Sequence, residues 1–174
     1  MIINLCKDEL SYYEFVKPIE KILNEKSIHY KQIKNADIEK ASKVIICGTA
    51  LKDFDYLKNL EYFNWLKGFE KPVLAICAGA QVIGCLNKLK LKTKTIIGSF
   101  EIDIVKENEL TKEKKIKVYC LFSKYILPNK NFEVIGYLNK IPVFLRKQNS
   151  LQFLTMFHPE VFNEDIIKNW IKLF

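Results

Sequence analysis

Arginine is almost absent from this sequence of 174 residues, although the chain is basic. Lysine and arginine together number 28 against 20 acidic residues, a net charge of +8, and Arg146 is the only arginine. Bidentate recognition of phosphate and guanine prefers the planar guanidinium group. The lysines also alternate with apolar residues, as in Lys88–Lys92, which is typical of a solvated face. We therefore expect no nucleic-acid partner, and the basic charge suits docking of an acidic protein instead.

Long hydrophobic runs are also missing. No apolar run approaches the ~20 residues that a membrane-spanning helix needs, although 49% of the residues are hydrophobic. The first thirteen residues pass from a strand-like segment directly into charge, without a basic leader or a small-residue cleavage site. These absences predict a cytoplasmic protein that does not interact with membranes.

Cysteine pairs are lacking as well. The five cysteines, an odd number, include no Cys-x-x-Cys motif, which argues against a disulfide framework and against a four-ligand zinc site. We expect no metal and no cofactor. Four of the five lie among aliphatic residues and are expected to fill the core, whereas Cys77 has a different setting.

Linkers, repeats and low-complexity stretches are absent, so residues 1–174 are expected to form a single domain. In the first half, apolar strand-like segments alternate with helical patterns, which favours a parallel sheet with helices on both faces. The expected strands are Ile2–Leu5, Ile28–Ile33, Lys43–Cys47 and Pro72–Ile76. The expected helices follow Asp8 or Ser11 as a cap, cover Asp53–Lys67, and begin at Ala78.

The second half consists mainly of strand-like segments, which suggests an antiparallel extension. These segments are Thr95–Val105, Lys117–Phe122, Phe132–Leu138, Pro142–Leu145 and Leu151–Phe157, before an amphipathic helix over Glu164–Phe174. The predicted fold is a flavodoxin-like, three-layer α/β/α domain. Its central sheet is expected to be mainly parallel, with the antiparallel strands added in the C-terminal half.

Cys77 lies where a buried strand turns sharply into a helix. Its neighbours Ala75, Ala78, Gly79 and Ala80 are small, as they must be where the backbone passes close to itself and to a substrate. The helix dipole favours a thiolate at this position. Free N–H groups of the first helical turn can also face a developing oxyanion. A buried structural cysteine would fit the turn equally well, so a second signal is needed.

The second signal is the segment Phe-His-Pro-Glu, which contains one of the two histidines. His158 ends a strand, and Glu160 follows it two residues later. Residues two apart in an extended chain point to the same side, so Glu160 can orient the imidazole as the third member of a nucleophile–base–orienter triad. His29, the other histidine, has no acidic or thiol neighbour and is expected to be structural or exposed.

Taken together, Pro72–Gln81 and Phe157–Val161 resemble the class I, or triad, glutamine amidotransferases. The resemblance extends over essentially the whole chain and includes the strand ending at Gly48 and the stretch Leu127–Gly136. The layout is closest to a free-standing glutaminase subunit of the archaeal GMP synthase type. It implies a glutaminase that hydrolyses glutamine to glutamate and ammonia through a thioester, with the ammonia passed to a separate synthase partner.

The resemblance also implies roles for individual residues. Cys77 would be the nucleophile, His158 the general base and then acid, and Glu160 the orienting carboxylate. An oxyanion hole would use the backbone N–H of Ala78 and a second from Thr49 or, failing that, Gly48. Gln81 matches a glutamine that contacts the substrate in this family.

Four departures from the family pattern stand out. Ala75 replaces the first glycine of the usual turn, and Thr49 stands where a second glycine is common. Met156 replaces a glutamine, and Tyr119–Lys124 stands in place of a Ser-His-x-Asp segment that helps communicate with the synthase. These departures keep two alternatives open: a γ-glutamyl hydrolase with the same triad, and a catalytically silent regulatory relative.

Overall fold

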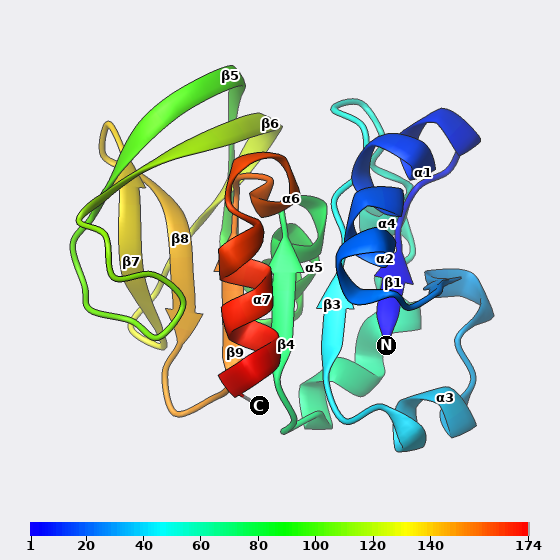
Figure 1. The fold of residues 1–174 in the computed structure, drawn as a ribbon. Coiled ribbons are helices and arrows are strands. Elements are labelled where there is room, and N and C mark those ends of the chain that lie inside the picture. Colours follow the sequence, from blue (N-terminus) through cyan, green and yellow to red (C-terminus); the bar gives the residue numbers. More distant parts are fainter. Residues whose placement is uncertain (174) are drawn as a thin grey trace.

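The computed structural model describes residues 1–173. The strands of this part are β1 Ile2–Asn4, β2 Ser27–His29, β3 Val44–Ile46, β4 Val73–Ile76, β5 Lys90–Ile104, β6 Lys115–Leu127, β7 Phe132–Leu138, β8 Ile141–Lys147 and β9 Gln152–Thr155. They form one sheet in the order β2-β1-β3-β4-β9-β8-β7-β5-β6 (Figure 1). The sheet therefore joins the two halves of the chain where β9 lies beside β4.

Parallel pairing covers the first five strands of this order, from β2 to β9. β3, β4 and β9 are buried along their whole length, as expected of parallel strands covered on both faces. Because the carboxyl ends of parallel strands meet at one edge, the residues that follow β3, β4 and β9 are brought together there. These residues include Gly48, Cys77 and His158.

The expectation of a mainly parallel sheet is wrong, because the sheet is mixed and mostly antiparallel. The parallel strands contain three or four residues each, whereas β5 and β6 contain 15 and 13. Exposed and buried residues alternate along β6, which is the pattern of an antiparallel strand with one solvated face. β5 begins at Lys90 rather than at the expected Thr95, since Lys90 and Lys92 alternate with Leu91 and pair with the end of β6.

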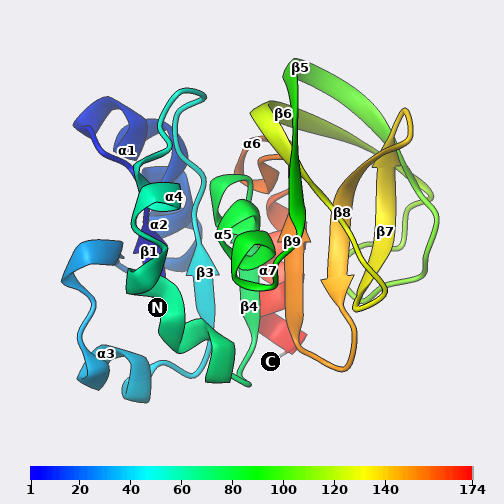
Figure 2. The ribbon, with the colours of Figure 1, turned by 180° about the vertical axis from the view of Figure 1, so that it is seen from behind.

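Helices flank both faces of the parallel half, as Figures 1 and 2 show from opposite sides. One face carries α1 Glu9–Phe15, α2 Lys17–Leu23, α6 Pro159–Phe162 and α7 Glu164–Leu173. The other carries α4 Asp55–Lys58, the 3₁₀ segment η2 Leu60–Gly68 and α5 Ala78–Leu86, while η1 Tyr30–Gln32 and α3 Asn35–Lys40 lie in the connection from β2 to β3. Asp8 caps α1, and its carboxylate accepts the backbone N–H of Ser11. The expected C-terminal helix is present, with Phe174 outside the described residues.

Two further expected elements differ from the structure. The helix predicted over Asp53–Lys67 is divided into α4 and η2 at Asn59, whose side-chain amide donates to the carbonyl of Asp55 at 2.8 Å and so competes with regular helix pairing. The strand predicted over Ile28–Ile33 ends at His29. There the chain turns to bury Tyr30, whose ring stacks on Phe63 with the centroids 5.1 Å apart.

Candidate active site

Cys77 occupies a strained turn between β4 and α5. Its φ and ψ are 48° and −98°, values that a residue with a side chain rarely adopts and that cost roughly 1–3 kcal/mol. The backbone N–H of Cys77 donates to the carbonyl of Thr155 at 2.6 Å, and its own carbonyl accepts the N–H of Gln81. These hydrogen bonds stabilise the strained backbone conformation. The thiol therefore belongs to the residue immediately before α5.

The small residues around Cys77 are required by close packing. A Cβ on Gly79 would collide with the backbone carbonyl of Ile46 on the neighbouring strand. Ala75 and Ala80 are fully buried, and Ala78 nearly so. Ala75, which replaces the usual glycine of this turn, fits within β4 opposite Ile46, so the departure leaves the turn intact.

His158 and Glu160 form a buried pair. Nδ1 of His158 and Oε1 of Glu160 are 2.8 Å apart, with side-chain exposures of 0% and 1%. The predicted pairing is therefore present, although its backbone differs from the extended path expected. Pro159 is the first residue of α6 and Glu160 lies in the first helical turn, because proline suits that position.

Two further contacts hold His158, one through its backbone and one through its ring. The backbone N–H of His158 donates to the carbonyl of Tyr119 on β6 at 2.8 Å. The ring lies against Phe15 of α1, with the centroids 5.1 Å apart. Segments from three parts of the chain therefore fix the position of one side chain, as is usual for a group whose orientation matters chemically.

Gly48 lies between the histidine and the cysteine. A Cβ built on Gly48 would lie 2.5 Å from Cε1 of His158 and 3.6 Å from Cβ of Cys77. The two side chains are thus neighbours across the end of β3, and they leave no space for a side chain at residue 48. Only glycine fits this position without displacing the imidazole.

The electrostatics of the pair favour a charged imidazole. Burial lowers the pKa of His158, but the Glu160 carboxylate and the nearby Cys77 sulfur act in the opposite direction, and the pKa is raised well above its usual value. Within residues 1–173, Nε2 of His158 has no hydrogen-bond partner. That nitrogen is therefore free to exchange a proton with a reacting group, while Nδ1 stays bound to the carboxylate.

The expected oxyanion donors lie at the same edge of the sheet. Ala78 is the first residue of α5, so its N–H has no acceptor within the helix. The Gly48 carbonyl accepts the thiol of Cys6 at 3.7 Å. Because the peptide is trans, the N–H of Thr49 points to the opposite side from that carbonyl. The Thr49 side chain is buried and its hydroxyl donates to Asp53 at 2.9 Å, which steadies the loop.

Gln81, the expected substrate contact, is bound on both ends of its amide. Its Oε1 accepts the hydroxyl of Tyr56 at 2.8 Å, and its Nε2 donates to the carbonyl of Lys124 at 3.0 Å. Tyr56 and Leu121 are residues of this site that the sequence did not indicate. Tyr56 has the pattern of a core aromatic, and Leu121 contributes its backbone carbonyl, which any residue would supply.

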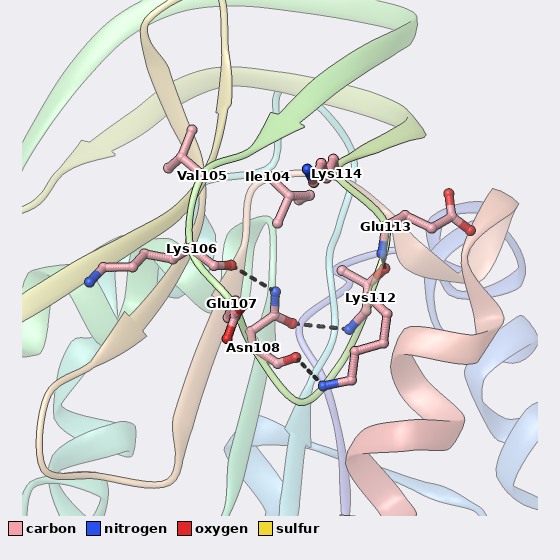
Figure 3. A pocket seen from close by; sticks show the side chains of 9 residues that line it. Ile104, Val105, Lys106, Glu107, Asn108, Lys112, Glu113 and Lys114 are labelled. Atoms are coloured by element: carbon pink, nitrogen blue, oxygen red, sulfur yellow. Dashed lines mark hydrogen bonds between the residues drawn. The ribbon is translucent and has the colours of Figure 1, made fainter.

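The cavity beside Cys77 is small, about 10 Å³, which is near the lower limit for a single water molecule. A second cavity of about 410 Å³ lies within the loop from Ile104 to Lys114 (Figure 3). Two of its lysines have partners: Lys112 donates to the carbonyl of Asn108 at 3.2 Å, and Lys106 pairs with Glu133. No cysteine or histidine lines it, so the chemical site is the closed one at Cys77.

Metal and membrane sites are not found in the described part of the chain. Residues 1–173 contain no cluster of three or more His, Cys, Asp or Glu side chains placed to hold a metal ion. No helix among these residues has the length and apolar character needed to cross a membrane.

Comparison with known proteins identifies the fold. Neither a protein-family model nor a curated protein sequence matches the chain. Among solved structures, one described as a GMP synthase subunit from Thermoplasma acidophilum has a TM-score of 0.86 at 16% identity, over 99% of this chain and 93% of that one. A glutamine amidotransferase from Thermotoga maritima has a TM-score of 0.71 at 16% identity, covering 99% and 80%. A glutamine amidotransferase from Methylobacillus flagellatus has a TM-score of 0.68 at 12% identity, covering 99% and 74%. The chain therefore has the fold of these proteins.

Proposed function

We propose that this protein is a glutaminase that hydrolyses glutamine to glutamate and ammonia through a Cys77–His158–Glu160 triad. The observation that carries the proposal is the buried His158–Glu160 pair, held against the strained Cys77 across Gly48. The fold shared with glutamine amidotransferases supports the choice of substrate class.

The first half of the reaction makes a thioester. Cys77 transfers its proton to Nε2 of His158, and the sulfur attacks the side-chain amide carbon of glutamine. The resulting oxyanion would accept the N–H groups of Ala78 and Thr49, each worth roughly 10²–10³ in rate. The intermediate collapses as the C–N bond breaks, and His158 returns the proton to the departing ammonia.

The second half regenerates the enzyme. His158 removes a proton from a water molecule, which attacks the thioester carbon through a second oxyanion. The C–S bond then breaks to release glutamate, and His158 returns the proton to the Cys77 sulfur. Glu160 remains a carboxylate throughout, orienting the imidazole and stabilising its charged form. The raised pKa of His158 suits a group that holds a proton during each intermediate.

We further propose that the ammonia goes to a separate synthase protein. A lysine-rich strip on β5, formed by the exposed Lys90, Lys92 and Lys94, supports docking of an acidic surface, because these lysines make no ion pair within residues 1–173. The name of the Thermoplasma structure, a synthase subunit, is consistent with this arrangement.

The function is tested by measuring ammonia release from glutamine for the wild-type protein and for His158→Ala, alone and with any co-purifying partner. We expect His158→Ala to abolish release while the protein remains folded by circular dichroism. Unchanged release in His158→Ala would overturn the triad. Turnover of γ-glutamyl peptides at a higher rate than glutamine would reassign the substrate to the γ-glutamyl hydrolase alternative.

A further inference from the structure

The segment Leu121–Lys124 of β6 lies over the nucleophile. The Cys77 thiol donates to the carbonyl of Leu121 at 3.4 Å. The hydroxyl of Ser123 donates to the carbonyl of Leu51, also at 3.4 Å, and so connects β6 to the loop after β3. Lys124 places its ammonium 4.5 Å from the centre of the Phe54 ring in the same loop. We call Leu121–Lys124 the clasp, because its contacts join both sides of the site.

The clasp occupies the position that a substrate would need. Leu121, Phe122 and Ser123 line the cavity beside Cys77, which measures about 10 Å³, whereas pockets for small ligands are typically roughly 300 Å³ or larger. A glutamine side chain cannot enter without a movement of this lining. The rest of the lining comes from the loop Thr49–Phe54, from Tyr56 and from the turn into α5, and the clasp is the part that lies beside an irregular strand pairing.

The clasp makes hydrogen bonds to two residues that the proposed reaction uses, Cys77 and Gln81. The Leu121 carbonyl accepts the Cys77 thiol, so the sulfur is bound to the clasp rather than left for a substrate. The Lys124 carbonyl accepts from the Gln81 side-chain amide, whose oxygen already accepts the Tyr56 hydroxyl. The clasp therefore holds both the nucleophile and the neighbouring polar side chain in an unproductive arrangement.

The strand pairing is irregular at the clasp. The register of β5 and β6 shifts between Thr93 and Ile96, so that two residues of β5 stand opposite Ser123. Such a bulge interrupts the ladder and bends the strand locally. The clasp thus lies where β6 has the weakest pairing to its neighbour in this part of the hairpin.

We propose that the clasp is an autoinhibitory element: it fills the substrate position in the free protein, and glutamine binds only when Leu121–Lys124 moves off Cys77. This inference rests on the proposed function for the identity of the substrate. The closing of the site by the clasp stands independently of it, since the cavity and the contacts of Cys77 involve no assumption about the ligand.

The experiment measures the rate at which Cys77 of the intact protein is alkylated, resolved by peptide mass spectrometry. Two reagents are compared, iodoacetamide and a chloroketone analogue of glutamine. Leu121→Ala shortens a residue that lines the cavity while keeping its carbonyl, and it is expected to raise both rates roughly tenfold. Ser123→Ala removes the bond to Leu51 with little change of volume and is expected to raise them about threefold.

Leu127→Ala is the matched control, since Leu127 is a half-buried leucine of the same strand that does not line the cavity. Its rates should equal those of the wild type, and labelling of the half-buried Cys85 should be the same in all variants. If Cys77 is alkylated no faster in Ser123→Ala and in Leu121→Ala than in the wild type, the proposal that the clasp closes the site is wrong. If the substitutions accelerate alkylation by iodoacetamide but not by the glutamine analogue, the clasp does close the site, and the assignment of glutamine as the substrate fails.

Discussion

β3 and β4 are neighbouring parallel strands, and a cysteine follows each at the same edge of the sheet, yet the two thiols have different settings. Cys47 continues the direction of β3, donates its N–H to Ile3 at 3.0 Å and is fully buried, and burial raises the pKa of its thiol well above the usual value. Cys77 instead turns into α5 at a positive φ and lies beside His158. A strand end with a cysteine therefore becomes a candidate nucleophile only when the backbone turns into a helix next to a base.

The largest expected effect comes from removing each thiol in turn. Cys77→Ala should reduce ammonia release from glutamine to background, by roughly 10⁶-fold, because the covalent step is lost. Cys47→Ala is the matched control and should retain the activity to within about tenfold, with a small loss of thermal stability from the missing core atom. A comparable loss of activity in both variants would show that the two strand ends do not differ as described.

The next largest effect concerns Glu160, the carboxylate that pairs with His158 beside Cys77. Cys47 is not part of such a catalytic pair. Glu160→Gln should lower the rate roughly 10⁴-fold, since an orienting group of this kind sets the tautomer and supports the imidazolium. The variant should remain folded, because the amide is nearly isosteric with the carboxylate. Wild-type activity in Glu160→Gln would contradict the role of the buried pair.

The same variant changes how stability depends on pH. The folded-state pKa of His158 is raised from 6.5, so its contribution to stability is complete below about pH 6.5 and is lost as the pH rises through the folded-state pKa. In Glu160→Gln the largest contribution that opposes burial is removed, so the pKa of His158 should fall and the stability that it contributes below about pH 6.5 should shrink. Thermal melts of both proteins from about pH 5 to about pH 9 would reveal the change in slope.

The smallest of the three effects on activity is expected at Gly48, which follows Cys47 and lies next to the His158 ring. Gly48→Ala should displace the imidazole and lower activity roughly 10²-fold, because a misplacement of about 1 Å has this cost. Gly68→Ala is the control, since a Cβ there meets no atom within 4 Å. Equal activity in both alanine variants would show that the packing at Gly48 is less restrictive than the geometry indicates.

Local chemistry made it predictable which residues lie together at the candidate site. The turn at Cys77 has its small neighbours in consecutive positions, and His158 and Glu160 are two residues apart, so each signal lies within a few residues of sequence. The fold shared with the solved glutamine amidotransferases was also expected from these motifs. The proportion of antiparallel sheet was not, because the alternation along Lys90–Lys94 resembles a solvated surface as much as a strand.

The sequence by itself determined the strand-to-helix turn at Cys77, the proximity of Glu160 to His158 and the α/β class, because these depend on interactions between near neighbours in the chain. Only the tertiary structure decided that Gly48 separates the thiol from the imidazole, that Tyr56 holds Gln81, and that the clasp covers the nucleophile. These contacts join segments that are 25 or more residues apart, and the contact at Cys77 uses a backbone carbonyl. A backbone carbonyl is present at every residue, so its role depends on where the chain passes and leaves no mark in the sequence.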